Sequence, residues 1–280
     1  QIYLHQLILH PLSKIKMKYL EFTDVEIHEL KSEIIGETFE ILVKQPDPQI
    51  LSLFGNKPLP VVYGTDANLS AGGYINTLEG LLLGGEIPPV LFIGIRYKLG
   101  DEPDFMQFVT SRTREFTPTE DAENQKLMEQ MTLREVKGGG AENFLKFLTT
   151  ELRDWVSERF NVSDDTTYIG DSMGGLFGLY TLFTEPRAFK RYVIGSPWQE
   201  WNHPTTFELE ESYAENNNDM EAIVYMASGA EEHIIGPHLE KMNPVMVEIF
   251  SKAKTAEYTV QLIEKLNGRN YPNLKLKGCL

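Results

Sequence analysis

A serine set between glycines is the residue pattern in this chain best suited to covalent chemistry. Residues 170–174 read Gly-Asp-Ser-Met-Gly, which fits Gly-x-Ser-x-Gly. Glycines flank the serine of a sharp strand-to-helix turn because the backbone segments come too close for a Cβ. The Ser172 hydroxyl would then be exposed above a sheet, and the next helix would direct its N-terminal N–H groups at the group under attack. The pattern predicts that Ser172 is a nucleophile.

The sequence on both sides of Ser172 strengthens this prediction. The bare motif would occur by chance about 0.1 times in a chain of this length. Here a β-branched and aromatic stretch at 167–169 precedes it, and residues 173–184 have helical apolar spacing with no proline before Pro186. The alternative is a small-residue turn in an α/β domain with an idle serine.

The composition restricts the classes of function. At 280 residues, with 41% hydrophobic and 24% charged residues, the chain can form one large α/β domain or two small ones. The net charge of −15 argues against a nucleic-acid or anionic-membrane partner. No apolar run approaches the ~20 residues of a membrane span. No clean signal peptide is present, so we expect a cytoplasmic protein, or a periplasmic one if a native leader is missing.

Metal and cofactor chemistry is not expected. Cys279 is the single cysteine, which excludes an internal disulfide and a cysteine-based metal site. The sequence has no His/Cys/Asp cluster at ligand spacing. We therefore predict that neither a metal nor an organic cofactor takes part. The sequence does not indicate the oligomeric state.

Strand-like and helix-like segments alternate along the chain. Two segments with period-two patterning, at 22–30 and 37–44, predict an antiparallel pair at a sheet edge. Apolar runs typical of buried strands follow at 59–63, 89–95, 191–197 and 222–229. Helical patterns between them predict a mostly parallel central sheet with helices on both faces.

Two further features concern the edges of this sheet. Residues 97–140 break the alternation and predict an irregular lid insertion, which we call the lid segment. Ligands of parallel sheets bind at the carboxyl ends of the strands. The polar turns expected at those ends are 64–68, Arg96, Ser172, Ser196 and 231–232.

The ends of the chain suggest domain limits. Residues 1–21 are interpreted as an N-terminal extension that need not be native, because Met17 is a more natural start. Residues 22–280 are interpreted as one α/β domain. The stretch 275–280 reads as a strand interrupted midway, so we expect the domain to be truncated at its C-terminus.

With these motifs the chain resembles the α/β hydrolases, and more narrowly the putative-esterase family that includes the enterobactin and salmochelin trilactone esterases. The matching positions are 170–175, Thr65-Asp66, Ser111-Arg112 with Phe116 to Pro118, and Ser196-Pro197 with Trp201. The resemblance implies an α/β-hydrolase fold and a serine ester hydrolase. It further implies an acyl-serine intermediate and a small ester or siderophore-like lactone as the small-molecule substrate.

The resemblance also implies roles for single residues. Ser172 would be the nucleophile, and the backbone N–H groups of Met173 and Asp66 would form the oxyanion hole. Arg112 would bind substrate, and Trp201 would line the cleft. Ala67 stands where the family usually has glycine, which affects only the local turn.

The general base and the acid are less determined. In the family the catalytic histidine follows the last core strand, so we expect it beyond Leu280; His233 and His238 are the alternatives within the chain. Glu232 fits the family's Gly-x-x-Glu and is the candidate acid, with Glu231 as its neighbour. The resemblance to trilactone esterases also allows a dyad of serine and histidine alone. In that case neither Glu232 nor Glu231 would be needed as the acid.

Several alternatives stay open at this point. Arg112 could grip a substrate carboxylate or catecholate, or pair with an acidic side chain of the chain itself. For Arg114 we favour a structural role, and Arg96 is undecided. A binding protein that has lost its base, and an acyltransferase, are the rival functions.

Overall fold

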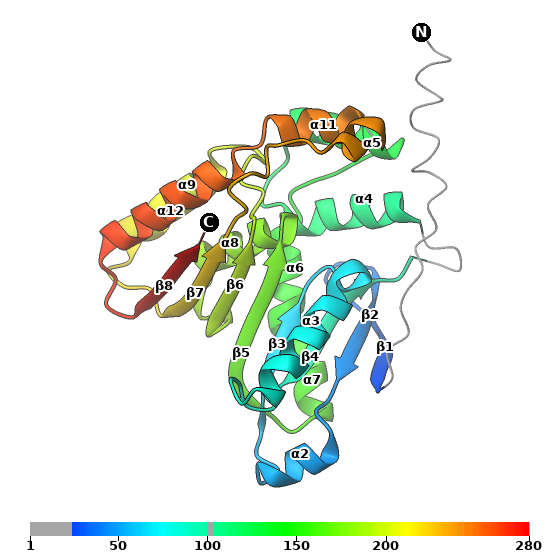
Figure 1. Ribbon diagram of the computed structural model, residues 1–280, viewed down its shortest axis with the longest axis vertical. Helices are drawn as coiled ribbons and strands as arrows, with labels where there is room; N and C mark the ends of the chain where they lie inside the picture. The colour runs from blue at the N-terminus through cyan, green and yellow to red at the C-terminus, as the bar shows by residue number, and fades with distance from the viewer. Residues whose placement is uncertain (1–23, 100–103, 243, 280) are drawn as a thin grey trace.

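The central element of the fold is one sheet of eight strands, in the order β1-β2-β4-β3-β5-β6-β7-β8. The computed structural model describes residues 24–99, 104–242 and 244–279. The expected N-terminal extension, residues 1–21, lies outside the described residues. Figure 1 shows the sheet with helices on both faces.

The strand arrangement confirms the predicted topology. β1 (Val25–Lys31) and β2 (Thr38–Lys44) form the antiparallel pair at one edge, and β2 is also antiparallel to β4. The remaining pairs are parallel. Their strands are β3 (Leu59–Gly64), β4 (Leu91–Tyr97), β5 (Val162–Asp171), β6 (Arg191–Gly195), β7 (Ala222–Ala227) and β8 (Leu274–Cys279).

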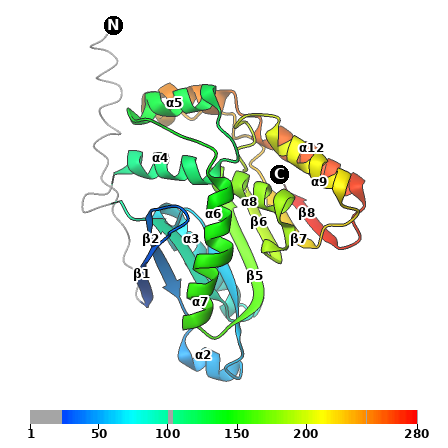
Figure 2. The same ribbon diagram turned by 180° about the vertical axis from the view of Figure 1, so that it is seen from behind.

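Helices cover both faces of the sheet. α3 (Ala67–Leu83) lies on one face (Figure 1), whereas α8 (Met173–Thr184) lies on the other (Figure 2). A continuous helix of α6 (Ala141–Phe147), the π-helical η2 (Leu148–Leu152) and α7 (Arg153–Arg159) runs beside α8. All seven residues of β4 are buried because the sheet is covered on both sides there. The structure therefore has the expected α/β-hydrolase architecture.

The lid segment differs from the irregular stretch that the sequence suggested. It contains α4 (Phe105–Phe116) and α5 (Ala122–Thr132), which lie beyond the carboxyl ends of the parallel strands (Figure 1). Asp104 and Asp121 cap these helices by accepting backbone N–H bonds in the first turn. The buried residues Met106, Val109, Thr113 and Phe116 of α4 recur every three or four positions, so this helix could have been recognised in the sequence.

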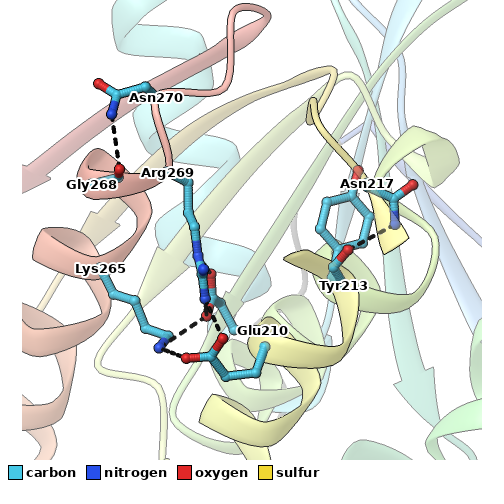
Figure 3. A network of polar contacts seen from close by, with 8 residues as sticks. Glu210, Tyr213, Asn217, Lys265, Gly268, Arg269 and Asn270 are labelled. Atoms are coloured by element: carbon cyan, nitrogen blue, oxygen red, sulfur yellow. Dashed lines mark hydrogen bonds and ion pairs between the residues drawn. The ribbon is translucent and has the colours of Figure 1, made fainter. Parts of the chain in front are cut away.

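A cluster of ion pairs joins α9 (Thr205–Asn216) to α12 (Thr255–Arg269) (Figure 3). Glu210 of α9 has a side chain that is only 1% exposed. Arg269 of α12 donates to both of its oxygens, at 2.8 and 2.9 Å, and Lys265 Nζ lies 3.4 Å away. The other helices within the described residues are α2 (Pro48–Leu53), η3 (Pro186–Ala188), α10 (Pro237–Met242) and α11 (Pro244–Ser251).

Candidate active site

Ser172 occupies a strained turn between β5 and α8. Its φ of 56° and ψ of −117° lie in a region that residues with a side chain rarely adopt. The Ser172 N–H donates to the Gly195 carbonyl at 3.0 Å, and the Ser172 carbonyl accepts from the N–H groups of Trp198 and Leu176 at 3.0 and 2.9 Å. These bonds fix the backbone of the turn, while Ser172 itself is exposed. The predicted sharp turn between a strand and a helix is therefore present.

The glycines around Ser172 allow three close approaches, two to backbone carbonyl oxygens and one to a side-chain hydroxyl. A Cβ on Gly170 would lie 2.6 Å from the Gly174 carbonyl oxygen. A Cβ on Gly174 would lie 2.7 Å from Thr65 Oγ1, and one on Gly175 would lie 2.7 Å from the Gly195 carbonyl oxygen. Any other residue at these positions would push α8 away from the strands that support it.

The turn at Thr65 and Asp66 lies against the N-terminus of α8. The Thr65 N–H donates to the Ile169 carbonyl at 3.1 Å. The buried Tyr168 hydroxyl donates to the Gly174 carbonyl at 2.6 Å and lies 3.3 Å from Thr65 Oγ1. The turn after β3 and the turn after β5 are thus joined by hydrogen bonds.

Two backbone N–H groups are available at this junction. Asp66 precedes α3 with a left-handed φ of 56°, and Met173 is the first residue of α8. Within the described residues, no acceptor receives the N–H of Asp66 or of Met173. The first N–H groups of a helix have no partner within the helix and carry its positive dipole end. Both could therefore donate to an oxyanion.

Arg112 reaches this junction from α4, but its guanidinium is already engaged. Arg112 Nε donates to Asp66 Oδ1 at 2.8 Å, and Nη2 donates to Oδ2 at 2.6 Å. The two side chains are 14% and 9% exposed, and the guanidinium lies 5.6 Å from the ring centres of Phe108 and Phe116. The predicted substrate fork thus faces a carboxylate of the chain itself.

The other two arginines also pair with acidic side chains. Arg96 Nε donates to Glu40 at 2.6 Å across β4 and β2. Arg114 contacts Glu115 and Glu37, in line with the structural role that we favoured.

Trp201 is fully buried, which corrects its expected place in the cleft wall. Its indole N–H donates to the Thr119 carbonyl at 2.8 Å, and a Cβ on Gly138 would lie 2.7 Å from its ring. Trp201 therefore supports the lid segment from inside. Trp198 was missed by the sequence analysis: it is half-buried, its N–H binds the Ser172 carbonyl, and its ring centre lies 5.6 Å from that of Trp201. Its position directly after Ser196-Pro197 was the available signal.

Glu232 lies in the loop after β7 and is held in place. Its Oε1 accepts the Gly229 N–H at 2.7 Å and the Ser196 hydroxyl, while its neighbour Glu231 is exposed. Glu200, which was not predicted from the sequence, accepts the Lys254 N–H through Oε1 at 2.5 Å. Burial raises the pKa of Glu200 above its ordinary value, and the nearby Glu232 adds to this effect.

None of the histidines in the described residues forms a hydrogen bond with Ser172. His28 pairs with Glu26 on β1, and the His203 ring is stacked on Tyr258 at 4.2 Å between centres. His233 and His238 are exposed. His5 and His10 lie outside the described residues, and the identity of the base stays a prediction.

Two properties of the described residues bear on other classes of function. No three His, Cys, Asp or Glu side chains among them are grouped to hold a metal ion. No helix among them has the length and apolar character needed to cross a membrane.

The chain is similar in sequence and in fold to proteins named as esterases and hydrolases. The chain is 30% identical over 240 residues to the ferri-bacillibactin esterase BesA of Bacillus subtilis, covering 81% of this chain and 76% of that protein. It is 29% identical over 175 residues to the siderophore triacetylfusarinine C esterase of Aspergillus fumigatus, covering 60% and 53% of the two chains. The fold resembles the siderophore hydrolase EstA of Aspergillus nidulans, with a TM-score of 0.71 at 20% identity over 94% and 91% of the chains. Residues 32–265 match the family described as "Putative esterase", and the chain belongs to that family of ester hydrolases.

Proposed function

We propose that this esterase cleaves a siderophore-like ester or lactone through an acyl-Ser172 intermediate. The observation that carries the proposal is the exposed Ser172 in its strained turn, beside the two unused N–H groups of Met173 and Asp66. Curated relatives are named as esterases of ferri-bacillibactin and of triacetylfusarinine C. These names support a siderophore ester as the substrate class.

The reaction has two halves. The Ser172 hydroxyl attacks the ester carbonyl while a base takes its proton, and the alcohol leaves with that proton. Water then attacks the acyl-serine in the same way and releases the acid. In both halves the N–H groups of Met173 and Asp66 stabilise the oxyanion, and one such donor is typically worth about 3–4 kcal/mol.

The proposed base is a histidine that follows β8. Cys279 pairs with Ala227 at the ends of β8 and β7, and the Ser228 N–H donates to the Cys279 carbonyl at 3.2 Å. The chain beyond β8 would therefore start beside the loop that holds Glu232. Both described hydrogen bonds to Glu232 use Oε1, which leaves Oε2 to orient an imidazole.

The proposal is tested on the full-length protein with a fluorophosphonate probe and a panel of p-nitrophenyl esters and siderophore lactones. We expect the probe to label the wild type and Ser157→Ala equally, because Ser157 lies on α7 away from the site. Ser172→Ala should lose both labelling and hydrolysis. Labelling of another serine in Ser172→Ala would refute the assignment. A wild type without labelling would instead favour the binding protein, and ester exchange with an added alcohol would favour the acyltransferase.

A further inference from the structure

The inference concerns the ion pair between Arg112 and Asp66, and it rests on the proposed function. We propose that Arg112 is a positioning residue, which holds the oxyanion donor at Asp66 instead of gripping an anionic group of the substrate. The pair joins α4 of the lid segment to the turn after β3.

The conformation of Asp66 is unusual for its position. Aspartate before a helix normally caps it, with its carboxylate accepting an N–H of the first turn. Asp66 precedes α3 but makes no such bond, and its φ of 56° is left-handed. Its carboxylate is turned to Arg112 instead. Arg112 therefore keeps the Asp66 side chain from capping α3. It also holds Asp66 in a conformation in which its backbone N–H has no acceptor.

The burial of the pair makes Arg112 a poor ligand for a substrate anion. Its side chain is 14% exposed and packs near the rings of Phe108 and Phe116. An anion could take the guanidinium only by displacing the Asp66 carboxylate. That carboxylate would then stay buried without a partner, which is strongly unfavourable.

The surrounding contacts fix both ends of the pair. On α4, the hydroxyl of Thr113 contacts the sulfur of Met173, the other predicted oxyanion residue, at 3.6 Å. On α3, the Asn68 side chain accepts the Tyr97 N–H at 2.8 Å and donates to the Tyr97 carbonyl at 3.1 Å. Arg112 thus connects two elements that are each anchored near the oxyanion donors.

A positioning role and a substrate-binding role predict different kinetics. Loss of one oxyanion donor lowers kcat by about 10²–10³-fold, and a misplacement of 1 Å can cost about 10²-fold. Because Arg112→Ala would displace the Asp66 N–H without deleting it, we expect kcat to fall roughly 10–100-fold. This loss should be equal for neutral and anionic esters, with KM changed less than about twofold, because ground-state binding is not involved.

The experiment compares Arg112→Ala with Arg134→Ala in the full-length protein. Arg134 is the matched control, since it also belongs to the lid segment and pairs with a carboxylate, Asp104, at 2.6 Å. The substrates are p-nitrophenyl acetate and the monoanionic p-nitrophenyl succinate. Fluorophosphonate titration counts active serines, so that kcat refers to folded sites. Added methylguanidinium should restore part of the kcat of Arg112→Ala and leave Arg134→Ala unchanged.

The outcomes separate this inference from the proposed function. A wild type without hydrolysis or labelling overturns the proposed function itself. A normal wild type with an Arg112→Ala defect confined to the KM of the anionic ester overturns the positioning role. The positioning role is also overturned if Arg112→Ala has an unchanged kcat, or if Arg134→Ala loses as much kcat as Arg112→Ala. If Arg112→Ala does not fold, Asp66→Asn keeps the backbone N–H and the side-chain shape, and should lower kcat on both esters.

Discussion

Replacing Ser172 by glycine should make the protein more stable than replacing it by alanine. At φ 56° and ψ −117° a residue with a Cβ is strained, which costs about 1–3 kcal/mol. Alanine keeps this strain, whereas glycine adopts the conformation freely. Glycine loses more backbone entropy on folding, which costs about 0.5–1 kcal/mol relative to alanine. The difference of these effects predicts that Ser172→Gly is more stable than Ser172→Ala by about 1 kcal/mol.

The assay is thermal and denaturant unfolding of both variants, followed by circular dichroism. A difference of about 1 kcal/mol corresponds to about 2–4 °C in Tm for a domain of this size class. Ser157 provides the control pair because it lies inside α7, where glycine should be less stable than alanine by about 1 kcal/mol. If the Ser172 pair shows the same order as the Ser157 pair, the turn carries no strain and the reasoning is refuted.

Three further outcomes are expected. Arg269→Ala should lower the free energy of unfolding by about 2 kcal/mol in a denaturant titration, because the buried Glu210 loses its bidentate partner. Lys252→Ala is the control: it removes an exposed ion pair and should change the free energy of unfolding by less than about 0.5 kcal/mol. Burial raises the pKa of Glu115 to about 7, so the folded state favours the protonated acid, and stability should fall as the pH rises from about 4.5 to about 7. Glu115→Gln should remove up to about 3 kcal/mol of this change in the free energy of unfolding. The denaturant midpoint of the variant should therefore vary less with pH than that of the wild type. Esterase activity should survive dialysis against EDTA, and loss that a divalent ion restores would contradict the predicted absence of a metal.

The parts of the fold that follow local patterns could be predicted from the sequence. α8 spans Met173–Thr184, as its apolar spacing and the proline that follows it indicated. β4 is buried throughout, as expected from its uninterrupted apolar residues. The turn at Ser172 was recognisable because three glycines are each required by a contact within it or beside it. In each case the pattern and the contact lie within a few residues of one another.

The parts that depend on distant partners could not be predicted. Arg112 and Asp66 are 46 positions apart, and nothing near either residue indicates that they form a pair. Trp201 and Thr119 are 82 positions apart, so the sequence shows an aromatic residue after a strand but not that the lid segment buries it. α4 and α5 were missed because Pro118 and the glycines at 138–140 suggested an irregular segment, although the apolar spacing within α4 is helical.

The strained residues at the carboxyl edge of the sheet share one means of support. Asp66 and Ser172 follow the adjacent strands β3 and β5, Ser196 follows β6, and each has a positive φ. The parallel hydrogen-bond ladder continues past the strand ends: Thr65 N–H donates to the β5 carbonyl of Ile169, and the N–H groups of Ser172 and Ser196 donate to the last residues of β6 and β7. Each turn is thus tied to the neighbouring strand, which fixes its unusual backbone more firmly than a free loop could. The backbone at Ser172 and the turn that leads to Asp66 are therefore set by the register of the sheet, and Arg112 of α4 adds a side-chain contact at Asp66.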